Sequence, residues 1–449
     1  MRLALAFAAL LLGTTAHAAP PKAPTLPHER FVLGNGMPVL LHVDHTVPIV
    51  VVDVSYGVGS RDEVAGRTGF AHLFEHLMFM GTRRAPTKMF DAWMEGAGGW
   101  NNAWTSEDRT NYYDVAPPTA LGLLLWLEAD RMLDVGPLMT QEKLNAQRDV
   151  VRNERRQSYE NRPYGKADLR LSELLYPPGH PYHHPVIGSH ADLEAAQVAD
   201  VKAFFARYYD PANAALVVAG DFDPVSVKPQ IQKLFEKIPS RRSASAQESG
   251  KPAAVTLSPL TSDVRESLQD DVELPRITFA WRSPAHLTQE DAALDVLATV
   301  LGQGPASRLH ARFVVKDKNV QEVSAMQSSR ALSSDFEIEL TAKKDTSLAA
   351  LEKGVLEEVE KIAKNGIEPA ELARAKALIE HMFYQRIERV QERASLLAMY
   401  ETEAHDHEFF AKDRARYDAV SIDSIKAVAA SVFRAPKVVL TVTPKGAAR

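Results

Sequence analysis

The sequence predicts an α+β protein of two homologous domains, each a mainly antiparallel sheet with helices packed on one face. The chain of 449 residues is longer than one typical domain. A polar stretch of small residues at 240–252, SRRSASAQESGKP, divides the chain near its middle. Each flank of that stretch ends in an amphipathic helical pattern followed by an apolar, β-rich run, at 201–220 and at 425–444.

These two end segments align without a gap at an offset of 224 residues, with Tyr209 and Phe433 at the same place. The starts of the halves match more weakly, as the predicted strands 48–60 and 275–286, each followed by a helical pattern. We interpret the match as an internal duplication. The alternative is that any two α+β domains share strand–helix pieces. Alternation in the strands predicts one buried face, covered by long helices such as 348–364 and 369–393.

The N-terminus predicts export. Arg2, an apolar run at 3–12 and the small-residue site Ala16-His17-Ala18 have the layout of a secretory signal peptide. The alternative, a membrane anchor, needs a longer apolar run than this one. We therefore expect a signal peptide at 1–18, a periplasmic mature protein and domains at 26–240 and 255–449 joined by a linker at 241–254.

Composition limits the chemistry that is available. The formal net charge of −6 and the isoelectric point near 6.2 give no support for nucleic-acid binding. The chain contains no cysteine, which excludes disulfides and thiolate ligands. Any bound metal must therefore be held by His, Asp or Glu.

Residues 69–81, GFAHLFEHLMFMG, place two histidines and a glutamate in an apolar run of helical length. With Thr68 as the expected N-cap and Gly81 just past the C-terminus, His72, Glu75 and His76 share one arc about 100° wide. Imidazoles at i and i+4 are spaced to bind one Zn²⁺, and HxxEH is a zinc-peptidase motif. The alternative is a chance match, with the histidines hydrogen-bonded in a core. A true site needs a third ligand.

Helical phase identifies a candidate for that ligand in the segment 141–160. Glu154 falls on the apolar face with Leu144 and Val151, because its angle on the helical wheel is close to theirs. The other acids of this segment project from the opposite face: Glu142, Asp149 and Glu160. A metal would satisfy the buried carboxylate of Glu154. The alternative is a buried ion pair with a nearby arginine: Arg152, Arg155 or Arg156.

Several motifs in order carry a resemblance: GVGSRDEVAGRTGFAHLFEHLMFMGT, NNAWTSEDRTNYY, LEADRM and QRDVVRNERRQSYENRPYG. They resemble the insulinase/pitrilysin family of zinc peptidases, above all its short forms that are similar to the mitochondrial processing peptidase. The resemblance implies a duplicated α+β fold and a Zn²⁺ cofactor. It assigns His72, His76 and Glu154 as zinc ligands and Glu75 as general base. The family often has a further Glu where this chain has Gln147.

Two further segments, 98–115 and 180–190, are interpreted apart from the metal ligands. The strand within 98–115 corresponds in the family to an edge strand that pairs with extended substrate, and the resemblance carries Asn102 over as a substrate-binding residue. The histidine-rich segment 180–190, HPYHHPVIGSH, is rich in proline, and we interpret it as a structural loop.

The leading hypothesis is a zinc-dependent endopeptidase for peptides or unfolded segments. In complete family sites the C-terminal half of the assembly supplies an Arg and a Tyr, but the matching positions here are Val314 and Gln321. Arg308 and Arg312 are nearby but out of register, and the alternative is a shifted alignment. We therefore expect a heterodimer in which a homologous, non-catalytic subunit supplies Arg and Tyr. The alternatives are a non-catalytic scaffold or assembly subunit of the same family and a metal-delivery protein.

Overall fold

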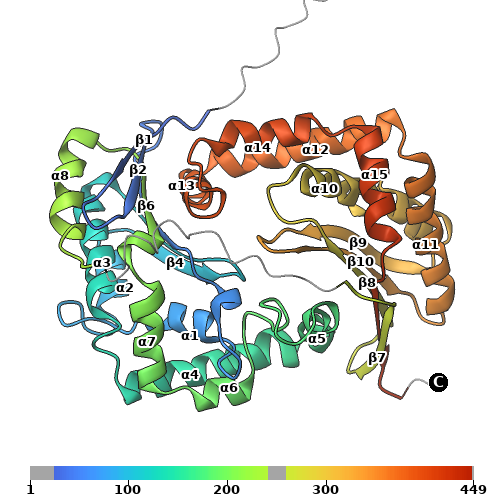
Figure 1. Ribbon diagram of the computed structural model, residues 1–449, viewed down its shortest axis with the longest axis horizontal. Coiled ribbons are helices and arrows are strands. Elements are labelled where there is room, and N and C mark those ends of the chain that lie inside the picture. Colours follow the sequence, from blue (N-terminus) through green and yellow to red (C-terminus); the bar gives the residue numbers. More distant parts are fainter. Residues whose placement is uncertain (1–24, 241–258, 447–449) are drawn as a thin grey trace, which may run out of the picture.

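The computed structural model describes residues 25–240 and 259–446. The predicted signal peptide (1–18) and the predicted linker (241–254) lie outside the described residues. The two halves lie beside each other, each built around its own sheet (Figure 1). Within the described ranges, no helix combines the length and the apolar character that crossing a membrane requires.

The first half holds a six-stranded sheet in the order β1-β2-β6-β3-β5-β4. Neighbouring strands are antiparallel except β2 and β6. Every residue of the two central strands β3 and β6 is buried, so both faces of the sheet centre are covered. The strands are β1 (Glu29–Val32), β2 (Pro38–Val43), β3 (Val50–Tyr56), β4 (Trp100–Thr105), β5 (Thr110–Ala116) and β6 (Ala214–Gly220).

The second half repeats this topology without a counterpart of β1. Its sheet has the order β7-β11-β8-β10-β9, and its only parallel pair among the described strands is β7 with β11, which corresponds to β2 with β6. The predicted duplication and the α+β fold class are confirmed. The strands are β7 (Val264–Asp270), β8 (Arg276–Ser283), β9 (Val320–Ser328), β10 (Ser334–Ala342) and β11 (Val438–Pro444).

All described helices but one in each half cover one face of their own sheet. The helices of the first half are α1 (Phe70–Leu77), α2 (Met89–Gly96), α3 (Leu121–Asp134), α4 (Gln141–Arg155), α5 (Gly165–Leu175), α6 (His190–Ala195), α7 (Val198–Tyr208) and α8 (Pro224–Phe235). Those of the second half are α10 (Gln289–Gly302), α11 (Leu348–Asn365), α12 (Pro369–Glu388), α13 (Val390–Met399), α14 (Phe409–Asp418) and α15 (Ile422–Phe433). The pairs α7–β6 and α15–β11 begin at the offset of 224 residues seen in the sequence.

The halves exchange one helix each. Helix α13 of the second half packs Ala394 and Leu397 against Val51 and Val217 of the first sheet. Helix α5 of the first half packs against the second sheet, where Leu175 joins a cluster with residues of β8 and β11. Figure 1 shows α13 beside the first sheet and α5 beside the second. Each sheet is thus covered on its second face by the other half, which makes burial there depend on both halves.

The prediction of one continuous helix at 369–393 is wrong, because the helix is broken at one residue. Arg389 adopts an extended conformation with φ −87° and ψ 128°, which ends α12 and lets α13 begin in a new direction. This break allows α13 to turn onto the first sheet.

Candidate metal centre

The motif helix α1 begins at Phe70, one residue later than expected, and its cap is not the predicted one. Gly69 occupies the N-cap with φ +85°, where an added Cβ would lie 2.8 Å from the carbonyl oxygen of Ile187. Thr68 instead donates its hydroxyl to Asp192 at 2.5 Å. The carboxylate of Glu63 accepts hydrogen bonds from the amides of Gly69 (2.8 Å) and Ala71 (2.7 Å), and so takes the role of the cap.

The C-terminus of the motif helix also differs from the prediction. Helix α1 ends at Leu77, so Gly81, with φ +77°, lies beyond the cap residue Met78 instead of following it directly. The two turns that carry the motif are nevertheless helical, which preserves the i, i+4 relationship of His72 and His76.

The structure brings His72, His76 and Glu154 together. Oε2 of Glu154, on α4, lies 3.6 Å from Nε2 of His72 and 3.3 Å from Nε2 of His76. Ligands at about 2.0–2.1 Å from a tetrahedral Zn²⁺ are separated by about 3.3–3.4 Å, so these atoms can share one ion with little movement. The three residues form one of two such clusters in the described part of the chain.

The protonation of this cluster suits a metal. Burial lowers the pKa of His72 to about 4, which keeps its imidazole neutral. A hydrogen bond with His76 lowers the pKa of Glu154, which keeps its carboxylate ionised. Neutral imidazole and ionised carboxylate are the metal-binding forms. Nδ1 of His72 is buried without a hydrogen-bond partner among the described residues, so packing holds this ring in place.

The alternative of an arginine ion pair for Glu154 is not the arrangement found. Arg152 pairs with Glu194 at 2.5 Å and Arg155 with Glu160 at 2.9 Å. Arg156 donates to Asn153. The carboxylate of Glu154 is left facing the two histidines.

Gln147 lies two helical turns before Glu154 on the same helix. Its amide nitrogen contacts Sδ of Met80 at 2.8 Å. The side chain at this family position therefore serves packing around the end of the motif segment in this chain.

Glu75 lies beside the cluster as a buried carboxylate. Burial raises the pKa of Glu75, while a 2.5 Å hydrogen bond from the hydroxyl of Thr105 acts in the opposite direction. Glu75, His72 and Glu154 line one cleft together with the end of strand β4 and Tyr159. Sequence reasoning missed Thr105, because nothing in its local pattern shows that it meets a residue thirty positions earlier.

Strand β4 is an edge of its sheet, as predicted. The amide of Ser106 donates a hydrogen bond to the carbonyl oxygen of Arg109 in the turn between β4 and β5. Because main-chain groups of an antiparallel strand point alternately to its two sides, Trp104 and Asn102 direct theirs to β5. Ala103 and Thr105 then direct theirs to the open edge. These edge-facing groups lie next to the cleft and face the side on which another extended chain can pair with β4.

Asn102 is not brought into the metal cluster. Its carboxamide oxygen accepts a 2.8 Å hydrogen bond from the amide of Ala103, which occupies one donor of the open edge. Strand alternation places its side chain on the face opposite to that of Thr105, which contacts Glu75. Residues 180–189 form turns and loop, as predicted, and His190 begins α6.

Both halves of the chain are similar to known proteins. Residues 38–176 match the family model described as insulinase (peptidase family M16), and residues 195–379 match that of the peptidase M16 inactive domain. The zinc protease PqqE of Helicobacter pylori is 30% identical over 376 residues, which cover 83% of each chain. A protease crystal structure from Helicobacter pylori has a TM-score of 0.84 at 28% identity, covering 93% of this chain and 99% of that one. The periplasmic protease PqqL from Escherichia coli shares the fold, with a TM-score of 0.75 at 18% identity, covering 93% of this chain and 47% of that one.

Proposed function

The chain belongs to the insulinase family of peptidases (peptidase family M16), and on that premise we propose that it is a zinc-dependent endopeptidase for peptides or unfolded protein segments. The observation that carries this proposal is that ligand atoms of His72, His76 and Glu154 lie within 4.8 Å of one another, with the buried carboxylate of Glu75 beside them.

Two imidazoles and one carboxylate favour Zn²⁺ over harder ions such as Mg²⁺ or Ca²⁺. His72, His76 and Glu154 would hold it. When bound, Zn²⁺ polarises the scissile carbonyl and makes water a better nucleophile near neutral pH.

Glu75 is the proposed general base. Thr105 binds Oε2 of this carboxylate, which leaves Oε1 to accept a proton from the attacking water and to return it to the leaving amine. Burial raises the pKa of Glu75, which makes its carboxylate a stronger base and moves the pKa toward neutrality, where one group can both take up and return a proton.

The open edge of β4 is the proposed substrate-positioning element. An extended peptide that pairs with the main-chain groups of Ala103 and Thr105 would lie along the cleft that Glu75 and His72 line. Asn102 stays a candidate for substrate binding, and its carboxamide would have to release the amide of Ala103 first.

The second half of the chain supports the proposal of a heterodimer. Val314 and Gln321 offer neither a guanidinium nor a phenol. The nearby arginines are engaged within the second half, Arg308 with Glu371 at 2.6 Å and Arg312 with Glu358 at 2.7 Å. A homologous partner subunit would supply the missing Arg and Tyr.

The proposed location is the periplasm, with residues 1–18 removed on export and domains at 26–240 and 255–449. The support is the N-terminal sequence pattern and the fold shared with a periplasmic protease of Escherichia coli.

The test is made on the mature protein without a metal-binding tag. We expect one tightly bound zinc per chain and hydrolysis of unfolded peptides that a chelator abolishes and added Zn²⁺ restores. Glu75→Gln keeps the size of the side chain but cannot act as a base, so it should retain zinc and lose turnover. A scaffold subunit would show no chelator-sensitive hydrolysis even with its partner, and a metal-delivery protein would pass zinc to an acceptor without needing Glu75.

A further inference from the structure

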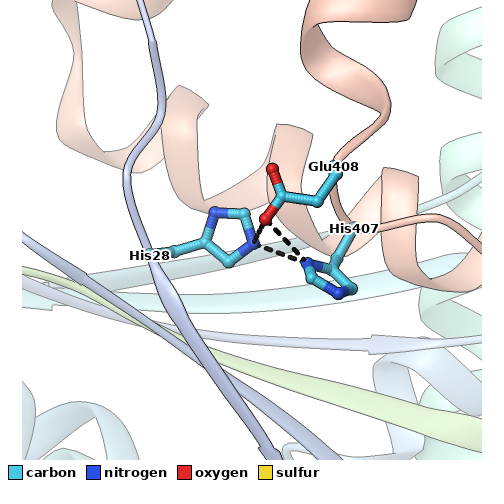
Figure 2. Close-up of side chains that lie close together, drawn as sticks. All are labelled: His28, His407 and Glu408. Carbon is cyan, nitrogen blue, oxygen red and sulfur yellow. Dashed lines mark hydrogen bonds and ion pairs between the residues drawn. The ribbon is translucent and has the colours of Figure 1, made fainter.

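A second group of metal-ligating side chains lies far in the fold from the candidate metal centre. His28 belongs to the segment before β1, and His407 and Glu408 belong to the loop before α14 (Figure 2). Nε2 of His28 lies 2.9 Å from Nδ1 of His407 and 3.7 Å from Oε1 of Glu408. Nδ1 of His407 lies 3.4 Å from that same carboxylate oxygen. The three atoms therefore all lie within 3.7 Å of one another.

A backbone carbonyl fixes the orientation of the His28 ring. Its Nδ1 lies 2.7 Å from the carbonyl oxygen of Leu26 and must donate to it, which leaves a lone pair on Nε2. The next carbonyl, that of Pro27, accepts from Nδ1 of His42 at 2.7 Å. The His28 side chain is 3% exposed. A carbonyl that binds the second ring nitrogen is the usual support of a histidine that ligates a metal.

We propose that His28, His407 and Glu408 bind one divalent transition-metal ion of the Cu²⁺, Ni²⁺ or Zn²⁺ class. Imidazole nitrogen suits these ions, and the carboxylate supplies a charged third ligand. With bonds of about 2.0 Å, a nitrogen separation of 2.9 Å corresponds to an angle of about 90° at the ion, which matches tetragonal Cu²⁺ or Ni²⁺ better than tetrahedral Zn²⁺.

Without a metal, a hydrogen bond joins the two rings, because Nδ1–H of His407 can donate to Nε2 of His28. When the ion binds, the proton of His407 moves to its Nε2 and both facing nitrogens carry lone pairs. The exposed carboxylate of Glu408 needs only a side-chain rotation to join them. Neighbouring Asp406 is held by Lys412 and is not needed as a ligand.

The ion would connect the two halves of the chain. The segment of His28 leads into the first sheet. The loop of His407 comes after α13, the helix of the second half that packs on the first sheet. The ion pair of Arg30 with Glu401, at 2.8 Å, already crosses the same boundary. Binding to the folded state alone would stabilise this junction.

The test uses the full mature chain without a polyhistidine tag and with the first site removed by His72→Ala and His76→Ala. After treatment with a chelator, the protein is titrated calorimetrically with CuCl₂, NiCl₂ and ZnCl₂ in separate experiments. We expect the protein to bind one equivalent of at least one of these ions. With Cu²⁺ bound, electron paramagnetic resonance should show coupling of the copper electron spin to two imidazole nitrogens. His407→Gln should lower the affinity by about 100-fold or more, since it removes a direct ligand.

The matched control is His405→Asn in the same loop. His405 lies outside the cluster and has φ +51°, a backbone conformation that asparagine tolerates. This variant should bind as the parent does. The proposal is overturned if the parent binds none of the three ions, or if His407→Gln and His28→Gln leave binding unchanged while circular dichroism shows both variants folded. Because His407 is on a partly exposed loop, its variant carries the test even if His28→Gln does not fold.

Discussion

The hydroxyl of Thr105 donates a 2.5 Å hydrogen bond to Oε2 of Glu75, and so joins the open edge strand β4 to the motif helix α1. The two residues line the same cleft. A peptide bound along β4 would therefore be positioned by the same strand that orients the proposed base.

Replacing Thr105 tests whether this bond serves catalysis. Thr105→Val removes the hydroxyl at nearly constant volume, and a hydrogen bond to a charged group contributes about 1.5 kcal/mol, so kcat should fall by roughly tenfold. Zinc content should stay at the wild-type level, and Thr105→Ser should recover most of the rate. A Thr105→Val enzyme of unchanged kcat would show that the bond is only structural.

Replacing each proposed ligand tests the composition of the metal centre. His72→Ala, His76→Ala and Glu154→Ala should each lower zinc content after dialysis, because two ligands hold the ion far less tightly than three. Gln147→Ala on the same helix is the control and should retain zinc, since Gln147 contacts Met80 instead. Elemental analysis makes the measurement. Undiminished zinc in Glu154→Ala would remove that residue from the ligand set.

The edge strand can be tested through its main chain. Ala103→Pro removes an amide that points away from β5, so the sheet should tolerate it while one bond to substrate is lost and KM rises by about tenfold. Ala103→Ser keeps the amide and should behave as the wild type. Asn102→Ala separates two roles: KM should rise if its side chain binds substrate and fall if it only blocks the amide. Equal KM values for the proline and serine variants would exclude pairing at Ala103.

The subunit arrangement can be tested by mixing. The isolated chain should bind zinc yet cleave peptides slowly, and a homologue that lacks HxxEH but carries the Arg and Tyr should raise kcat/KM by at least about a hundredfold. Mutating that Arg in the partner should abolish the gain. Light scattering must accompany the assay, because full activity from a monomer or homodimer of this chain would rule out the heterodimer.

The boundary between the halves should respond to pH through His286. Burial acts to lower the pKa of His286, but the hydrogen bond to Glu403 and its charge raise it above the ordinary 6.5, with Asp291 and Arg416 as weaker influences. Glu403 also pairs with Arg109 of the first half at 2.8 Å. Because the folded pKa is raised, this stabilisation is fully present below about pH 6.5 and is lost as the pH rises through the higher folded value.

The measurement is the melting temperature of the wild type and His286→Gln between pH 5.5 and 8.5. At pH 5.5 the wild type should melt roughly 2 °C higher than His286→Gln. This difference between the two proteins should vanish at pH 8.5. A difference that grows with pH would contradict the assignment.

Helical periodicity made much of the candidate centre predictable. His72, Glu75 and His76 are neighbours through the local geometry of one helix, and the phase of a second helix distinguished Glu154 from three other acids. The duplication was also visible, because equivalent elements keep the same offset along the chain. Caps were predicted less well, since Glu63 reaches the start of α1 from outside the motif.

The sequence by itself determined which side chains share a face of a helix or strand, because backbone periodicity places residues a few positions apart. Only the tertiary structure decided which faces meet. The exchange of α5 and α13, the bond from Thr105 to Glu75 and the approach of His28 to His407 all join segments distant in sequence. The break at Arg389 is what lets α13 take part in that exchange. Such pairings depend on how buried surfaces of whole elements fit together, and no local pattern encodes that fit.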